Sequence, residues 1–173
     1  MSRERKSLDK HWYLAIDDSE VSFTEFEFSL IRIASAFDRW QRDCMACCVD
    51  GHSGTDAQLL CVIGMHERAK SISDIARLVN RDDSSNLAYN IRKLQGSGLI
   101  EKVGSSKRGV AYQITEQGRE IIVAYAQYRR ELLLDVMESL EDLSPKLEQT
   151  SKLLNLISGI YDQASCIAAS HRV

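Results

Sequence analysis

Three cysteines and one histidine, Cys44, Cys47, Cys48 and His52, lie within nine residues of one another. Thiolates and imidazoles bind zinc, and an accessible thiol with a lowered pKa reacts with peroxide. Structural zinc sites, however, usually draw their ligands from two separated pairs, and the sequence contains no second Cys pair. Buried cysteine also behaves as a small apolar residue. The cluster therefore has three interpretations: a metal site, a redox sensor, or one face of a helix packed in the core.

The residues that precede the cluster favour the third interpretation. Apolar residues recur every three or four positions, as they do on one face of a helix: Phe26, Leu30, Ile33, Phe37, Trp40, Cys44, Cys47 and Cys48. We expect a helix over residues 23–50 that buries the three thiols. A metal or redox role for the segment 44–48 remains the alternative.

No catalytic motif is visible in the chain. The sequence has no Gly-rich phosphate loop, no nucleophile in a recognisable turn and no paired carboxylates in the context of a pocket. We therefore predict that the protein is not an enzyme and needs no cofactor. The five cysteines are an odd number and fit a reducing compartment. No stretch approaches the roughly 18 apolar residues that span a bilayer, so we predict a cytoplasmic protein with no membrane partner.

The charge distribution points to a nucleic acid partner. The chain carries a net charge of −3, with 44% apolar and 27% charged residues. Residues 66–110 hold nine Lys or Arg against five Asp or Glu, a balance of +4 that leaves −7 for the remainder. A basic middle between acidic ends indicates one surface that faces nucleic acid on an otherwise acidic body.

Three helices are predicted around this basic segment, each preceded by a residue that can cap it. Thr55, with Gln58 three residues later, predicts a capping box at the start of a helix that runs to about residue 68. Ser73 is the expected N-cap of a short helix. Asp83 is the expected N-cap of a third helix, which ends near Gly96.

Beyond residue 98 the apolar period changes from helical to strict alternation. Strands are predicted over 99–103 and 110–115, joined by a polar tip with Gly at each end. Thr115 caps an expected helix that runs to about Leu140. Ser144, followed by Pro145, caps a final helix that reaches about residue 168. The predicted organisation is a polar arm (1–22), an N-terminal helix (23–50), a compact domain (55–115) and long C-terminal helices (116–173).

The order of helix, short helix, helix and basic hairpin predicts a winged helix-turn-helix. The third helix would enter the major groove, where base edges differ in their donors and acceptors, and the hairpin tip would reach the backbone or an adjacent minor groove. The candidate DNA contacts are Ser84, Ser85, Asn86, Tyr89, Asn90 and Lys93 on the helix, and Lys107 and Arg108 on the tip.

Two segments resemble the MarR-type winged helix-turn-helix transcriptional regulators: "ISDIARLVNRDDSSNLAYNIRKLQGSGLIEK" at 72–102 and "SKRGVAYQITEQG" at 106–118. The second matches the family's wing pattern, which ends in Leu-Thr-x-x-Gly, here at Ile114, Thr115 and Gly118. Two positions depart from the family: Ser106 stands where the wing usually has Asp, and Tyr89 where the recognition helix often has Arg.

The resemblance implies a mainly α fold with a small β-hairpin wing, flanked by long dimerisation helices. It also implies a homodimer that binds a pseudo-palindromic site on double-stranded DNA to regulate transcription, together with a small-molecule effector whose identity the sequence does not give. The apolar stripes of the terminal helices agree with self-association, since they are wider than one small domain needs. The alternative function is a winged helix that binds other proteins and not DNA.

Overall fold

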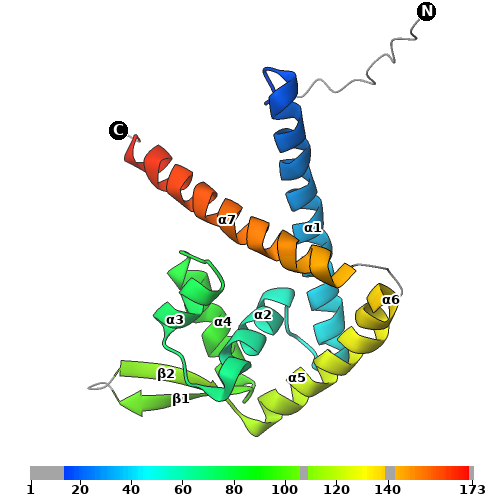
Figure 1. Cartoon of the computed structure of the whole chain (residues 1–173). Helices are drawn as coiled ribbons and strands as arrows, with labels where there is room; N and C mark the ends of the chain where they lie inside the picture. Colours follow the sequence, from blue (N-terminus) through cyan, green and yellow to red (C-terminus); the bar gives the residue numbers. More distant parts are fainter. Residues whose placement is uncertain (1–13, 106–108, 139–142, 172–173) are drawn as a thin grey trace, which may run out of the picture. The chain divides into compact units, whose positions relative to one another are not determined.

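The computed structural model describes residues 14–105, 109–138 and 143–171. The chain divides into two compact units, Met1–Ala126 and Gln127–Val173, which are described separately. The elements of the first unit are α1 (Asp18–Cys48), α2 (Gly54–Gly64), the short 3-10 turn η1 (Met65–Glu67), α3 (Ile72–Leu78), α4 (Ser84–Gly96), β1 (Ile100–Ser105), β2 (Gly109–Ile114) and most of α5 (Glu116–Arg129). The second unit contains the π-helical turn η2 (Arg130–Leu134), α6 (Asp135–Glu138) and α7 (Leu143–Ser170) (Figure 1). The predicted fold class, mainly α with one β-hairpin, is confirmed.

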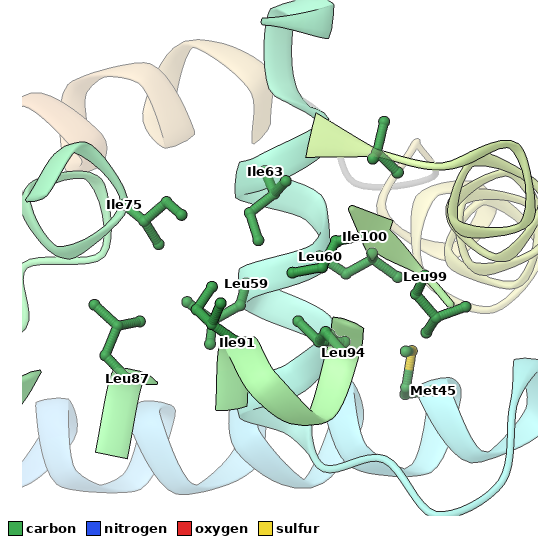
Figure 2. Packing of buried hydrophobic residues seen from close by; sticks show 12 residues of the cluster. Met45, Leu59, Leu60, Ile63, Ile75, Leu87, Ile91, Leu94, Leu99 and Ile100 are labelled. Carbon is green, nitrogen blue, oxygen red and sulfur yellow. The ribbon is translucent and has the colours of Figure 1, made fainter. Parts of the chain in front are cut away.

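The core of the first unit is built around α2. Figure 2 shows side chains from α2, α4 and β1 meeting in one interior, with Met45 of α1 at its edge. Leu87, Ile91 and Leu94 stand at helical spacing on α4 and are all at most 1% exposed. The remaining core members are Ala57, Leu59, Leu60, Ile63, Ile75, Leu99, Ile100 and Ile114. The helical period therefore identified the face that α4 buries.

The start of α2 differs from the prediction. Ser53, not Thr55, is the N-cap: its Oγ accepts from the backbone N–H of Asp56 at 3.2 Å. Asp56 returns the interaction, because its Oδ2 accepts from the backbone N–H of Ser53 at 2.8 Å. Two backbone N–H groups at the helix start, those of Ser53 and Asp56, are satisfied in this way. The predicted capping box of Thr55 and Gln58 is therefore wrong, and the overlapping pair of Ser53 and Asp56 forms the box instead.

The start of α3 is displaced by the same two residues. Ser71, not Ser73, caps the helix and forms a capping box with Asp74. The predicted cap of α4 is confirmed, since Asp83 accepts from the backbone N–H of Asn86 at 3.1 Å. An Asp lies in the first turn of α2 and of α3, and an Asp is the N-cap of α4; at each of these places the positive end of the helix dipole favours a carboxylate.

The wing is an antiparallel pair whose register runs from Ile100↔Ile114 to Ser105↔Gly109. A single backbone bridge between Lys70 and Tyr112 adds a third short edge to the hairpin. This bridge attaches β2 to the segment that connects α2 with α3. The wing is therefore tied to the helix-turn-helix by backbone hydrogen bonds as well as by packing.

The Ile-Thr-x-x-Gly pattern that ends the wing has a physical reason. Thr115 caps α5 as predicted, since its Oγ1 accepts from the backbone N–H of Gly118 at 3.1 Å and donates to the carbonyl of Gly98 at 2.6 Å. A Cβ placed on Gly118 would lie 2.1 Å from the carbonyl oxygen of Leu99. Only Gly allows α5 to lie this close to the strand backbone.

The terminal helices differ from the prediction in their limits. The first begins at Asp18, five residues before residue 23. The helix expected to run from 116 to about 140 is interrupted after Arg129 by the π-helical turn. The last helix begins at Leu143, so Ser144 lies in its first turn and is not its cap. Leu140 lies outside the described residues. Among the described helices, none combines the length and hydrophobicity needed to cross a membrane.

Candidate nucleic-acid interface

A tight turn joins α3 to α4 and sets the geometry of the helix-turn-helix. The backbone N–H of Arg81 donates to the carbonyl of Ala76 at 3.0 Å, and Asn80 has a left-handed φ of 49°. Asn tolerates this conformation better than most residues because its short polar side chain bonds locally. The turn then delivers the chain to Asp83, which caps α4. The N-terminal end of α4 is placed by these local interactions.

The first turns of α4 present polar side chains to solvent. Ser85 and Asn86 are exposed, and Tyr89 is 61% exposed. Asn86 also donates from Nδ2 to Asp83, and its backbone and side-chain hydrogen bonds lower the pKa of the Asp83 carboxyl. Ser84 is the first residue of α4. The exposed groups are a phenol, an amide and a hydroxyl, which are the kinds of side chain that can hydrogen-bond to base edges in the major groove.

Two other predicted contacts, Asn90 and Lys93, are engaged inside the protein. Asn90 Nδ2 lies 2.8 Å from Oδ1 of Asp56, and Lys93 Nζ lies 2.6 Å from its Oδ2. Asp56 is fully buried near the start of α2. Burial by itself raises the pKa of the Asp56 carboxyl, but hydrogen bonds from Lys93, Ser53 and Asn90 outweigh it and leave that pKa lowered. The two residues therefore fix α4 against α2, and their role as DNA contacts stays a prediction.

The wing tip residues Lys107 and Arg108 lie outside the described residues. The strands that lead to the tip are described: β1 ends at Ser105 and β2 begins at Gly109. Gly104 and Gly109 have left-handed φ values of 88° and 85°. A Cβ on Gly104 would lie 2.6 Å from the carbonyl oxygen of Gly109. The two glycines therefore form a narrow neck: a side chain at Gly104 would push the strands apart, whereas a Cβ on Gly109 would meet nothing within 4 Å.

Sequence reasoning missed two exposed basic residues close to these elements. Arg92 lies on the outer face of α4, and Lys102 lies on β1 opposite Tyr112. Both residues belong to the basic segment 66–110, so the excess of Lys and Arg in that segment could have pointed to them. Phosphate contacts from such side chains carry no sequence information, but they fix the position of the protein on a duplex.

The cysteines do not share one environment. Cys44 is buried as predicted, but Cys47 is exposed and Cys48 is half-buried. The prediction of three buried thiols is therefore wrong for Cys47, which lies on the solvent side of α1. Burial, and then the neighbouring Cys48, raise the pKa of the Cys44 thiol to about 11. Within the described parts of the chain, no three His, Cys, Asp or Glu side chains are grouped so as to hold a metal ion.

Comparison with known proteins agrees with this arrangement. The family model described as a winged helix DNA-binding domain matches residues 53–118. The fold also matches solved regulators over most of the chain. The transcriptional regulator BldR from Sulfolobus solfataricus is 19% identical, with a TM-score of 0.65, and the match covers 81% of this chain and 99% of that one.

Two further similar structures were solved with DNA. A MarR mutant from E. coli complexed with operator DNA is 17% identical, with a TM-score of 0.63 over 80% of this chain and 99% of that one. FabT from Streptococcus pneumoniae in complex with DNA is 16% identical, with a TM-score of 0.61 over 82% of this chain and 99% of that one. Among curated proteins, no sequence matches the chain.

The chain has the MarR-type winged helix fold. In the terms of that fold, α3 and α4 form the helix-turn-helix, α4 takes the place that the fold calls the recognition helix, and β1 and β2 form the wing. The MarR-type resemblance seen in two sequence segments is thus confirmed at the level of fold. The fold also explains why the polar turns of α4 and the base of the wing belong to one compact unit.

Proposed function

We propose that this protein is a sequence-specific DNA-binding transcriptional regulator and not an enzyme. The observation that carries the proposal is the solvent-exposed N-terminal part of α4, which is polar on its outer face and fixed to the body through Asp56 on its inner face. A rigid helix of this kind fits the major groove of B-DNA. Two proteins of the same fold, MarR and FabT, were solved with DNA, which supports the assignment.

The candidate contacts divide by location. We assign base-edge contacts in the major groove to Ser84, Ser85, Asn86 and Tyr89. We assign phosphate or minor-groove contacts to Lys107 and Arg108 of the tip, where positive charge meets the enhanced negative potential of a narrow groove. Asn90 and Lys93 support the helix through Asp56, and a direct contact by either one would require it to leave that carboxylate.

We further propose that the regulator acts as a homodimer on a pseudo-palindromic site. Large apolar side chains are exposed along both long terminal helices, each considered by itself. They include Phe28, Ile31, Ile33 and Phe37 on α1, and Leu153, Leu156, Ile160 and Ile167 on α7. The four residues of α7 stand at helical spacing on one face of that helix, and a contiguous exposed apolar surface is rare on monomers. A second copy that covers it would place two recognition helices about 34 Å apart, on successive major grooves.

The test begins with a random duplex at low salt. A regulator should bind it weakly, with an affinity that falls steeply as salt rises, because released counterions drive non-specific binding. Selection from a random duplex pool should then enrich a sequence with two related half-sites. A chain that binds no duplex at any salt concentration would instead be a winged helix for protein interaction. An enriched site without internal symmetry would contradict the dimer.

A further inference from the structure

The connector between α2 and α3 contains two consecutive residues with left-handed backbone conformations. His66 has φ 61° and Glu67 has φ 49°. In this conformation Cβ crowds the following carbonyl oxygen, so any residue other than Gly adopts it at an energetic cost. His is moderately enriched in such positions, but Glu is not. Interactions outside the pair must therefore hold the connector in place.

The ammonium group of Lys70 supplies these interactions. Its side chain is buried, and Nζ donates to the carbonyl oxygens of Ile63 at 3.0 Å and Arg68 at 2.9 Å, and also to that of Met65. The three acceptors lie on both sides of the left-handed pair, and they match the three donors of an ammonium. Burial and the nearby charge of Arg68 lower the pKa of Lys70. The ammonium therefore joins the backbone before the left-handed pair to the backbone after it, and so holds the connector in a closed loop.

The backbone of the same residue attaches the wing. The N–H of Lys70 donates to the carbonyl of Tyr112 at 2.9 Å, and the N–H of Tyr112 donates back at 2.8 Å. Tyr112 lies on β2, paired with Lys102 of β1. The strained loop therefore ends at the point where the wing joins the helix-turn-helix.

We propose that Lys70 is a positioning residue for the wing, which it places by holding His66 and Glu67 in their left-handed conformations. Its ammonium never touches DNA, since it is enclosed by backbone carbonyls. It acts by fixing where β2 is attached, and hence where the wing tip is presented. The consequence for DNA binding rests on the proposed function, but the effect on the wing attachment does not.

The first measurement is amide hydrogen exchange of the Lys70→Met variant, which keeps the apolar stem and removes all three donors. The Tyr112 amide should exchange at least fivefold faster, because local opening governs its protection. The amide of Ile91, in the buried part of α4, should change less, which separates local loosening from global unfolding. Lys152→Met, on exposed α7, is the control for the same change in charge. Should Lys70→Met fail to fold, Lys70→Gln, which keeps two donors, enters the same comparison.

The second measurement tests whether the backbone strain at Glu67 is what couples the loss of the Lys70 ammonium to the loosening of the Tyr112 amide. Glu67→Gly and Glu67→Ala are each combined with Lys70→Met. Both remove the same charge and the same ion pair with Arg119, but only Gly accepts a left-handed φ without penalty. Protection of the Tyr112 amide should return with Gly and not with Ala. Equal recovery with both residues, or no recovery with Gly, overturns the proposal.

The third measurement uses DNA. Lys70→Met should bind a random duplex at low salt about tenfold more weakly, and adding Arg108→Ala should cost little more, because both changes remove the same wing contact. Strictly additive losses would contradict the positioning role. If the wild type binds no duplex, the proposed function fails, and the exchange measurements still decide the role of Lys70. If a folded Lys70→Met variant shows an unchanged exchange rate at the Tyr112 amide, the inference is overturned, whatever the result of the DNA-binding measurement.

Discussion

The Nζ atom of Lys93 on α4 lies 2.6 Å from the carboxylate of Asp56 at the start of α2. Asp56 is fully buried, whereas the Lys93 side chain is 30% exposed. A buried carboxylate needs both a countercharge and hydrogen bonds, and here Lys93, Asn90 and Ser53 supply them. The pair therefore fixes α4 against α2, and we expect its loss to lower the stability of the fold before it changes any binding specificity.

Lys93→Met should destabilise the fold by about 2–3 kcal/mol, less than the roughly 3–5 kcal/mol for breaking a fully buried pair, because Lys93 is partly exposed. The pH dependence should change as well. The pKa of Asp56 is lowered in the folded state, so its contribution is present above the unfolded pKa and is lost as pH falls through the folded one. Without Lys93 that pKa rises, and acid unfolding should begin at higher pH.

Urea unfolding across a pH series measures both effects of Lys93→Met. Lys102→Met, on the exposed side of β1, is the matched control and should change neither stability nor the acid midpoint. An acid midpoint that stays unchanged in Lys93→Met would show that the ion pair does not govern the titration of Asp56.

Asn86 and Arg108 should affect DNA binding in different ways. Asn86→Ala should lose about 1–3 kcal/mol per half-site on the selected sequence and much less on random duplex, as expected for a residue that reads a base. Arg108→Ala should weaken binding to every sequence alike and reduce the salt slope of a dimer by roughly two. Affinities of both variants on selected and scrambled duplex, over a salt series, check these outcomes. If Asn86→Ala loses equal affinity on both duplexes, Asn86 contacts the phosphate backbone of the DNA and does not read a base.

Gly118→Ala should be strongly destabilising, by about 3 kcal/mol, because the new Cβ would overlap the carbonyl of Leu99 and the side chain of Ile114. Gly159→Ala on α7 is the control, since nothing lies within 4 Å of its would-be Cβ. That change should stabilise the helix by about 0.5–1 kcal/mol. Thermal unfolding of the two variants gives the comparison, and similar effects at both positions would refute the close contact.

The thiols should react in order of exposure. With a pKa of about 11, roughly one Cys44 thiol in a thousand is ionised at pH 8, and the thiolate is the reactive form. Cys47 and Cys166 are exposed and should be alkylated by iodoacetamide well before Cys44, which should react only on unfolding. Mass spectrometry of the labelled positions over time, with and without urea, reads the order. Rapid labelling of Cys44 in the native protein would restore the redox interpretation.

Leu156→Glu should convert the proposed dimer into a monomer. Leu156 is 63% exposed on α7, and a carboxylate buried in an apolar interface without a partner is strongly unfavourable. Gln149→Glu places the same charge at an exposed polar position of the same helix and should leave the dimer intact. Sedimentation at micromolar concentration measures both. A wild-type chain that sediments as a monomer would remove the basis for the homodimer.

The sequence was most informative where one local pattern determines the structure. The stripe of Leu87, Ile91 and Leu94 identified the buried face of α4, and alternation identified both strands of the wing. Thr115 was recognised as a cap because no competing cap lies beside it, and Asp83 was identified although Asp82 and Ser84 flank it. These features depend on neighbours a few residues away, which is the range over which periodicity and capping carry information.

The errors arose where patterns overlap or partners are distant in sequence. Ser53 with Asp56 and Thr55 with Gln58 are equally acceptable capping pairs, and only the burial of Asp56 against Lys93, 37 residues later, selects the first. The three carbonyls around Lys70 are likewise invisible in a sequence, because a lysine among polar residues is read as exposed. Apolar spacing placed Cys47 beside Cys44, yet only one of them faces the core.

The neck formed by Gly104 and Gly109 has an evolutionary consequence. The two backbones approach so closely there that a Cβ on Gly104 would lie 2.6 Å from the carbonyl oxygen of Gly109. This close approach constrains the ends of the two strands. We therefore expect substitutions at positions 106–108 to leave the register of the described hairpin unchanged. In descendants of this protein we therefore expect more sequence change at positions 106–108, where the proposed DNA contacts lie, than at Gly104.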